Sequence, residues 1–133
     1  MNPIVADSCT LILLTKINLL TAVLSRNRIY IPQQVYDETV TKGKEKARSD
    51  SFEIDAHVKN KRIILTSVPR KEKEMLERTF GLHAGERDAL AIAIQQRAVF
   101  LTDDYKARNA ANALGMEITG TLGILLTYYE EKN

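Results

Sequence analysis

The chain has 133 residues, a formal net charge of +2 and a hydrophobic content of 44%, values that are ordinary for one globular domain able to bury a core. No apolar run approaches the ~20 residues that a membrane span needs, and no basic segment precedes an apolar stretch, so neither a membrane helix nor a signal peptide is expected. The single Cys9 excludes an internal disulfide and a multi-cysteine zinc site, which favours a cytoplasmic location.

The first half of the chain alternates short apolar runs with helical patterns. The run 4–6 is too short for a helix and is typical of a buried strand. Pro32 suits the first position of a helix, because its fixed φ is already helical. In chain order we predict a strand at 4–6, a helix at 10–20 with a short continuation to 25, a strand at 28–31, a helix at 33–40, a cationic loop at 41–48 centred on Gly43, and a helix that begins at Ser49 or Asp50.

The second half continues the alternation. In order we predict a strand at 62–66, a helix at 71–80 capped by Gly81, a helix at 84–97, a strand at 99–102, a helix at 105–114 closed by Gly115, a strand at 116–119, and a final helix after Thr121 with Leu122, Leu125, Leu126 and Tyr129 on its apolar face. Alternating strands and helices predict one α/β domain over residues 1–133, with a parallel central β-sheet flanked by helices on both faces.

Acidic residues follow two of the predicted strands directly. Asp7 comes after the first strand, and Asp103 and Asp104 come after the strand at 99–102. In an open parallel sheet, ligands bind just beyond the carboxyl ends of the strands. Two strands that deliver carboxylates to one edge therefore predict a divalent-metal site.

Further acids lie on the predicted helices: Glu86 and Asp88 in the first turn of the helix at 84–97, and Glu38 on the helix that follows Pro32. Taken singly, each of the acids also suits a helix cap or the positive end of a helix dipole. Taken together, converging carboxylates repel one another unless a cation such as Mg²⁺ offsets their charge. A metal-bound water is a nucleophile, so the set predicts hydrolysis of a phosphodiester.

The chain resembles the PIN-domain ribonucleases, and most of all their branch of VapC-type toxins. The resemblance covers nearly the whole chain, and its motifs occur in the family's order. They are Val5-Ala6-Asp7-Ser8, then Ile31-Pro32-Gln33-Gln34-Val35-Tyr36-Asp37-Glu38, then His83-Ala84-Gly85-Glu86-Arg87-Asp88-Ala89, then Leu101-Thr102-Asp103-Asp104, and finally Gly120-Thr121-Leu122-Gly123-Ile124-Leu125.

The resemblance implies a metal-dependent endoribonuclease that uses Mg²⁺ or Mn²⁺. The family's four catalytic, metal-binding acids match Asp7, Glu38, Glu86 and Asp104. Asp88 is the alternative to Glu86, but the family's spacing favours Glu86, which replaces a more frequent aspartate. Asp103 is expected to help bind metal, and Ser8 and Thr102, each one residue from a ligand, to orient a water or phosphate.

The resemblance also implies partners. RNA is the expected substrate, and the cations Lys42, Lys44, Lys46 and Arg48 are candidates to grip its phosphates, although a merely solvated turn explains them as well. We expect a homodimer and an antitoxin protein able to cover the groove, as in a toxin–antitoxin pair. The alternative is a catalytically weak PIN-like scaffold or nucleic-acid-binding module.

Overall fold

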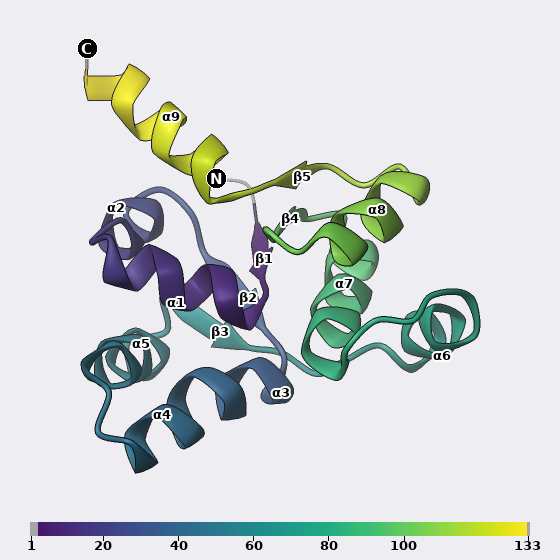
Figure 1. The fold of residues 1–133 in the computed structure, drawn as a ribbon, viewed down its shortest axis with the longest axis horizontal. Coiled ribbons are helices and arrows are strands. Elements are labelled where there is room, and N and C mark those ends of the chain that lie inside the picture. The colour runs from purple at the N-terminus through teal and green to yellow at the C-terminus, as the bar shows by residue number, and fades with distance from the viewer. Residues whose placement is uncertain (1–2, 133) are drawn as a thin grey trace.

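The computed structural model describes residues 3–132, and Figure 1 shows a central sheet with helices packed on both faces. Within these residues the sheet has five strands, all parallel, in the order β3-β2-β1-β4-β5. The strands are β1 (Ile4–Ala6), β2 (Ile29–Ile31), β3 (Ile63–Leu65), β4 (Val99–Leu101) and β5 (Ile118–Thr119). The predicted fold class is confirmed.

The helices alternate with these strands along the chain. They are α1 (Ser8–Lys16), α2 (Leu20–Leu24), α3 (Gln33–Tyr36), the π-helical turn η1 (Asp37–Thr41), α4 (Lys42–Glu45), α5 (Ser49–Lys59), α6 (Arg70–Thr79), α7 (Ala84–Gln96), α8 (Tyr105–Ala113) and α9 (Thr121–Lys132).

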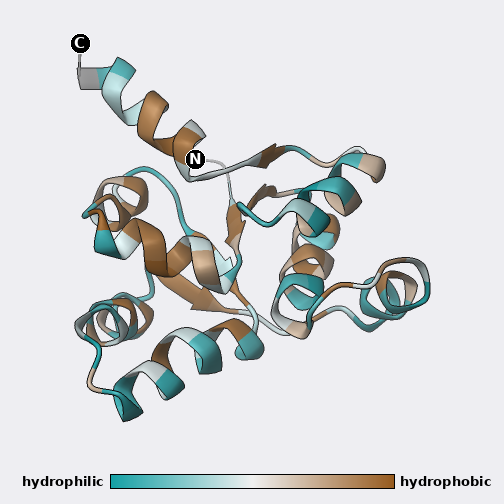
Figure 2. Cartoon of the chain, in the orientation of Figure 1, coloured by the Kyte–Doolittle hydropathy of each residue, from teal (hydrophilic) through white to brown (hydrophobic). Residues whose placement is uncertain are grey.

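The alternation of side chains along β1 divides the core into two layers. Ile4 and Ala6 belong to the cluster formed with α1, α2 and α5, whereas Val5 belongs to the cluster formed with α6, α7 and α8. Figure 2 shows hydrophobic residues along the strands and more hydrophilic residues on outlying helices such as α6. Fully burying one Leu or Phe side chain contributes about 1.5–3 kcal/mol, so both layers stabilise the sheet.

The strand order reverses between β1 and β4, which lie side by side at the centre of the sheet. Ala6 is in register with Leu101, and the amide of Asp7 donates to the carbonyl of Leu101 over 3.2 Å. Such a reversal leaves a crevice at the carboxyl ends of the two strands, where ligands of this fold class bind. Asp7 and Asp104 come from these two strand ends.

Three local predictions were wrong. The first helix breaks at Asn18, whose φ of 60° is left-handed, a conformation that asparagine tolerates better than most residues. The predicted cationic loop is helical as far as Glu45. Gly81 does not cap its helix, which ends at Thr79 and is followed by an extended Phe80.

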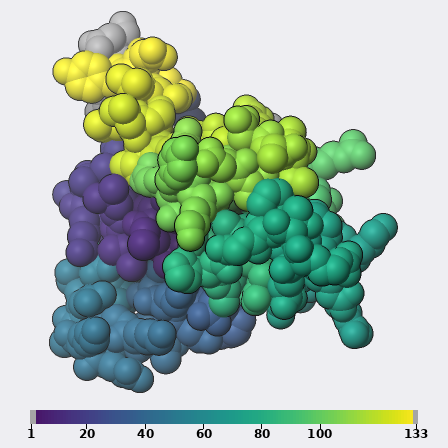
Figure 3. Space-filling view, turned by 45° about the vertical axis from the view of Figure 1, so that its right-hand side comes forward, coloured from purple at the N-terminus to yellow at the C-terminus, as the bar shows by residue number. Residues whose placement is uncertain are grey.

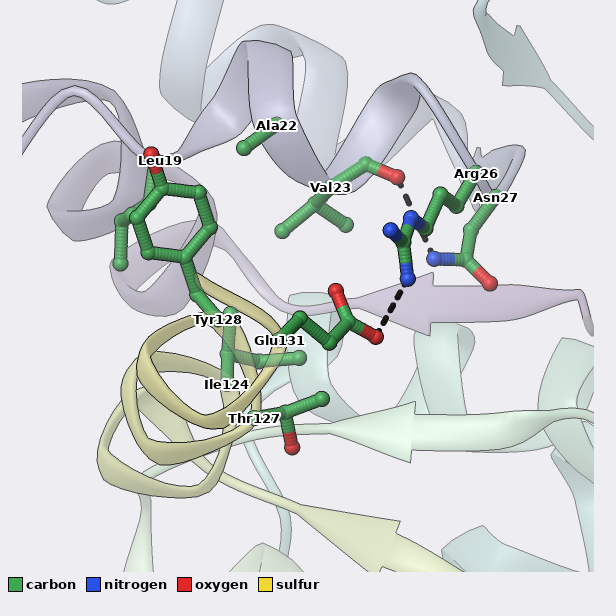
Figure 4. Close-up of a pocket in the computed structure, with 9 residues that line it drawn as sticks. All are labelled: Leu19, Ala22, Val23, Arg26, Asn27, Ile124, Thr127, Tyr128 and Glu131. Atoms are coloured by element: carbon green, nitrogen blue, oxygen red, sulfur yellow. Dashed lines mark hydrogen bonds and ion pairs between the residues drawn. The ribbon is translucent and has the colours of Figure 1, made fainter. Parts of the chain in front are cut away.

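The final helix, α9, projects from the rest of the molecule (Figures 1 and 3). Ile124 and Tyr128 pack beside Leu19 and Val23, and Arg26 forms an ion pair with Glu131 (Figure 4). The predicted apolar face of α9 lies on the other side and is exposed at Leu122, Leu125, Leu126 and Tyr129. No helix in the described part of the chain is long and apolar enough to cross a membrane.

Candidate functional site

A cavity of about 240 Å³ opens at the carboxyl ends of β1 and β4, and four of the predicted acids line it. The structure thus brings together side chains that follow β1 and β4 with side chains from η1 and the first turn of α7. Its lining residues are Asp7, Ser8, Cys9, Glu38, His83, Gly85, Glu86 and Asp104.

Asp7 is buried and caps α1. Its Oδ1 accepts from the amide of Thr10 over 3.0 Å, and its Oδ2 accepts from the hydroxyl of Thr102. The Thr102 Oγ1 also accepts from the amide of Asp104 over 3.1 Å, so it connects the acids that follow β1 and β4. Burial raises the pKa of Asp7 despite these hydrogen bonds, because the charged form loses solvation.

Glu86 and Asp104 form a carboxyl pair across the cavity. Burial, followed by the neighbouring Asp104, raises the pKa of Glu86 to about 8. The hydrogen bond with Glu86 lowers the pKa of Asp104, and Asp104 Oδ2 also accepts from the amide of Ala107 over 2.9 Å at the start of α8. At neutral pH Glu86 therefore holds a proton while Asp104 is ionised.

Glu38 reaches the cavity from the π-helical turn η1. Its Oε1 accepts from the Ser8 hydroxyl over 2.6 Å. A Cβ at Gly85 would lie 2.4 Å from the same oxygen, so a side chain there would displace the Glu38 carboxylate. Glycine thus leaves room for Glu38 against the start of α7.

Two predicted acids lie outside the cavity lining. Asp88 is buried and accepts from Arg87 Nε over 3.0 Å. Asp103 accepts from the amide and the hydroxyl of Thr121 over 2.8 and 2.5 Å, and from the hydroxyl of Thr10 over 3.5 Å. Asp103 therefore links the start of α9 to α1 through hydrogen bonds. This structural role gives a reason for an acid at position 103 that does not involve a metal.

The predicted phosphate-gripping cations divide into two kinds. Lys44 contacts the buried Asp55 over 2.5 Å and lies 5.2 Å from the centroid of the Phe52 ring, so its charge is already paired. Lys42, Lys46 and Arg48 are exposed.

Sequence reasoning gave no site role to three of the lining residues, His83, Cys9 and Gly85. Cys9 is two residues from Asp7, and His83 and Gly85 stand within three residues of Glu86. This closeness to predicted site acids is the only sequence signal that could have indicated them. Burial and the surrounding acids, Asp7 first among them, raise the pKa of the Cys9 thiol, so it stays protonated at neutral pH.

The donor set suits a hard divalent cation. The cavity lining described above contains four carboxyl groups and no lysine or arginine, and the Oε2 atom of Glu86 is buried without a hydrogen-bond partner. In the described part of the chain, no three His, Cys, Asp or Glu side chains already stand in a metal-holding arrangement. Mg²⁺ typically binds through one or two carboxylates and keeps several waters, so it does not need such a cluster.

Known structures share this fold. The chain resembles VapBC2 from Rickettsia felis, solved bound to a DNA fragment from their promoter, with a TM-score of 0.57 and 18% identity over 89% of this chain and 98% of that chain. It also resembles a domain of a functionally unknown protein from Methanocaldococcus jannaschii DSM 2661, with a TM-score of 0.53 and 20% identity over 90% of this chain and 91% of that one.

A search of the curated proteins found none that matches the chain. The family model of the PIN domain, however, matches residues 3–133. The match spans both acid-bearing strands, the π-helical turn and the helix that carries Glu86. The chain belongs to the PIN-domain family.

Proposed function

We propose that the protein is a metal-dependent endoribonuclease, which hydrolyses phosphodiester bonds of single-stranded RNA at the cavity between β1 and β4. The observation that carries the proposal is the convergence of Asp7, Glu38, Glu86 and Asp104 on that one cavity. Family membership supports a nuclease reaction, and RNA is the substrate implied by the resemblance to VapC-type toxins.

Asp7, Asp104 and Glu86 are the residues that would hold Mg²⁺ or Mn²⁺. When bound, the ion supplies a water of lowered pKa and offsets the negative charge on the phosphate. The Asp7 carboxylate accepts from the Thr10 amide and the Thr102 hydroxyl, and its two oxygens have further lone pairs that could bind an ion. Glu86 gives up its proton to bind, and its unpartnered Oε2 is then available as a donor atom.

Glu38 acts through its Ser8-bound carboxylate. The 2.6 Å hydrogen bond from Ser8 fixes the direction of Oε1 and leaves Oε2 to accept a proton from the attacking water or to hold a second ion. Thr102 orients Asp7 and the Asp104 amide at the same time. His83 has no assigned step.

The RNA backbone is held outside the cavity by the exposed cations Lys42, Lys46 and Arg48. They follow the turn that carries Glu38, so their charge lies on the same segment as one of the acids. Exposed cations of this kind attract phosphates without reading the sequence. Lys44 is left out of this group because Asp55 neutralises it.

The biological role we propose is that of the toxin in a toxin–antitoxin pair. The exposed apolar face of α9, with Leu122, Leu125, Leu126 and Tyr129, suits an interface with a second copy of the chain. An antitoxin protein that covered the cavity between β1 and β4 would inhibit the proposed ribonuclease. Light scattering at tens of micromolar is expected to give twice the mass of one chain, and a monomer would overturn the dimer.

The direct test of the proposed function is cleavage of a labelled single-stranded RNA by the purified protein. Cleavage is expected with Mg²⁺ or Mn²⁺, to stop in EDTA, and to return when the metal is restored in excess. Cleavage that continues unchanged in EDTA would overturn metal dependence. RNA binding without cleavage under any of these conditions would favour the nucleic-acid-binding module.

A further inference from the structure

The helix that carries Glu38 is irregular at the site itself. Between α3 and α4 the chain forms the π-helical turn η1, in which the amide of Lys42 donates to the carbonyl of Asp37. π-Helical turns inside α-helices are rare and frequently occur at functional sites. Because the extra residue rotates the side chains of the turn, whatever fixes η1 also fixes the direction of Glu38.

Helix α5 packs tightly against this turn. The Ser51 hydroxyl is buried and donates to the carbonyl of Thr39, inside η1, over 2.7 Å. A Cβ at Gly43 would lie 1.6 Å from Ser51 Oγ, so α4 and α5 approach as closely as they do because residue 43 has no side chain. This close approach explains why a glycine lies inside a helix here, where it otherwise weakens helical structure.

Asp55, which follows Ser51 by one helical turn along α5, contacts residues on both sides of η1. Its Oδ1 accepts from the Tyr36 hydroxyl over 2.9 Å, and its Oδ2 accepts from Lys44 over 2.5 Å. Tyr36 directly precedes η1, and Lys44 lies just beyond it. The Asp55 side chain is 5% exposed. The ammonium group of Lys59, on the solvent side of the helix, lies 3.3 Å from Asp55 Oδ2.

We propose that Asp55 is a positioning residue for the reaction: by holding Tyr36 and Lys44 it fixes the π-helical turn and aims Glu38 at Ser8 and the cavity. This inference rests on the proposed function for its catalytic consequence. It also assigns Lys44 to this framework and not to the binding of RNA. Lys44 holds the pKa of Asp55 below its usual range, as expected for a carboxylate that stays ionised in this contact.

The test is a double-mutant cycle between Asp55 and Glu38. Asp55→Asn is expected to lower kcat by about tenfold to a hundredfold with KM nearly unchanged, because a small misplacement of a reacting group has effects of this size. In a Glu38→Gln background the same substitution should produce no further loss, since a residue that acts through Glu38 has nothing left to position. Equal losses in both backgrounds would overturn the proposal.

Two further variants separate positioning from stability. Tyr36→Phe removes only the hydroxyl that donates to Asp55, so the variant should fold. It should lower kcat by less than Asp55→Asn does, and it should cause no further loss of kcat in the Glu38→Gln background. Glu53→Gln removes a carboxylate from the exposed side of the same helix and should leave kcat unchanged. A kcat loss in Glu53→Gln as large as that in Asp55→Asn would overturn the proposal.

A measurement without RNA distinguishes this proposal from the proposed function. The carboxyl carbon of Glu38, observed by NMR, should shift in Asp55→Asn and Tyr36→Phe and stay in place in Glu53→Gln. If the wild-type protein cleaves no RNA but the Glu38 signal moves as expected, the proposed function is overturned and the positioning role is supported. An unmoved Glu38 signal in both Asp55→Asn and Tyr36→Phe overturns the positioning role.

Discussion

The carboxyl groups of Glu86 and Asp104 lie within hydrogen-bonding reach of each other, and they share one proton at neutral pH. Burial and Asp104 raise the pKa of Glu86 to about 8, whereas the hydrogen bond from Glu86 lowers the pKa of Asp104. In a metal-free carboxyl pair of this kind, one pKa is raised, so one of the two groups stays protonated at neutral pH. If the cavity binds a cation as proposed, this pair would couple that binding to the release of a proton.

The first prediction is that binding of Mn²⁺ releases a proton below about pH 8. The cation competes with the Glu86 proton, so its apparent affinity should rise with pH and level off above about 8. The slope should be about tenfold per pH unit below that point, the value for one displaced proton. Calorimetry at pH 7 in buffers of different ionisation enthalpy measures the release. Binding of Mn²⁺ with no released proton would contradict this coupling.

The second prediction separates Glu86 from Asp88. Unfolded Glu86 loses its proton near 4.5 and folded Glu86 near 8, so the folded state binds more protons between these values. The metal-free protein should therefore lose stability as pH rises from about 4.5 to about 8. Glu86→Gln should flatten that part of the profile and abolish cleavage.

The matched control is Asp88→Asn, which changes an acid on the same helix whose carboxylate contacts Arg87 and lies outside the cavity lining. It should retain cleavage and the pH slope of thermal unfolding. If Asp88→Asn abolishes cleavage and Glu86→Gln does not, the third acid is assigned to the wrong residue.

Much of this arrangement was accessible from the sequence, and the reasons are local. Short apolar runs predicted the strands, and the shared edge of a parallel sheet predicted that Asp7 and the acids after β4 would lie together. The break at Asn18 was not predicted, because the apolar pattern continues through it. The helical path through Gly43 depends on close packing against Ser51, an approach between segments that no pattern in 41–48 reveals.

The neighbouring acids Asp103 and Asp104 are another case in which the sequence pattern does not reveal contacts between distant segments. Both follow β4, and only the path of the chain decides that Asp104 lines the cavity while Asp103 contacts Thr121. Likewise the charge of Lys44 is offset by Asp55, which lies eleven residues away in the sequence, and the surrounding lysines give no sign of this pairing. Contacts of this kind come from tertiary packing, which sequence periodicity does not encode.

The third prediction concerns Asp103. Asp103→Ala removes the acceptor for the amide and hydroxyl of Thr121 and for the hydroxyl of Thr10, so α9 should loosen. We expect a loss of about 1–2 kcal/mol in the free energy of unfolding, the size usual for a helix cap. Affinity for Mn²⁺ should stay within about threefold of wild type. This is a small change, because a tenfold change in affinity corresponds to ~1.4 kcal/mol of binding free energy. A loss of Mn²⁺ binding with unchanged stability would instead make Asp103 a metal ligand.

The fourth prediction compares two kinds of lysine after η1. Replacing Lys42 and Lys46 together by Gln should weaken RNA binding and flatten its salt dependence. The slope of the logarithm of the binding constant against the logarithm of salt concentration should fall by about one for each phosphate that the variant no longer neutralises. Lys44→Gln should instead lower the melting temperature, because it leaves the buried Asp55 with one fewer partner. Titrations of RNA at several salt concentrations, paired with melting curves, measure both effects. An unchanged salt slope in the Lys42 and Lys46 double variant would remove these residues from the RNA surface.

The fifth prediction concerns Asp7, on which the catalytic account depends most. Asp7→Asn keeps an oxygen to accept from the Thr10 amide and remains a good N-cap, so α1 and the fold should survive. It removes the negative charge of the buried residue that we propose as a metal ligand, so metal binding and cleavage should both fail. Thermal unfolding and circular dichroism check that the variant is folded.

The most direct measurement is the single-turnover cleavage rate of single-stranded RNA at saturating Mn²⁺, wild type against Asp7→Asn. We expect the rate to fall by at least about a hundredfold in the folded variant, since removing one charge-stabilising group at a reacting centre has effects of this order. Wild-type activity should also vanish in EDTA. An Asp7→Asn protein that cleaves at the wild-type rate would show that Asp7 is not needed for catalysis.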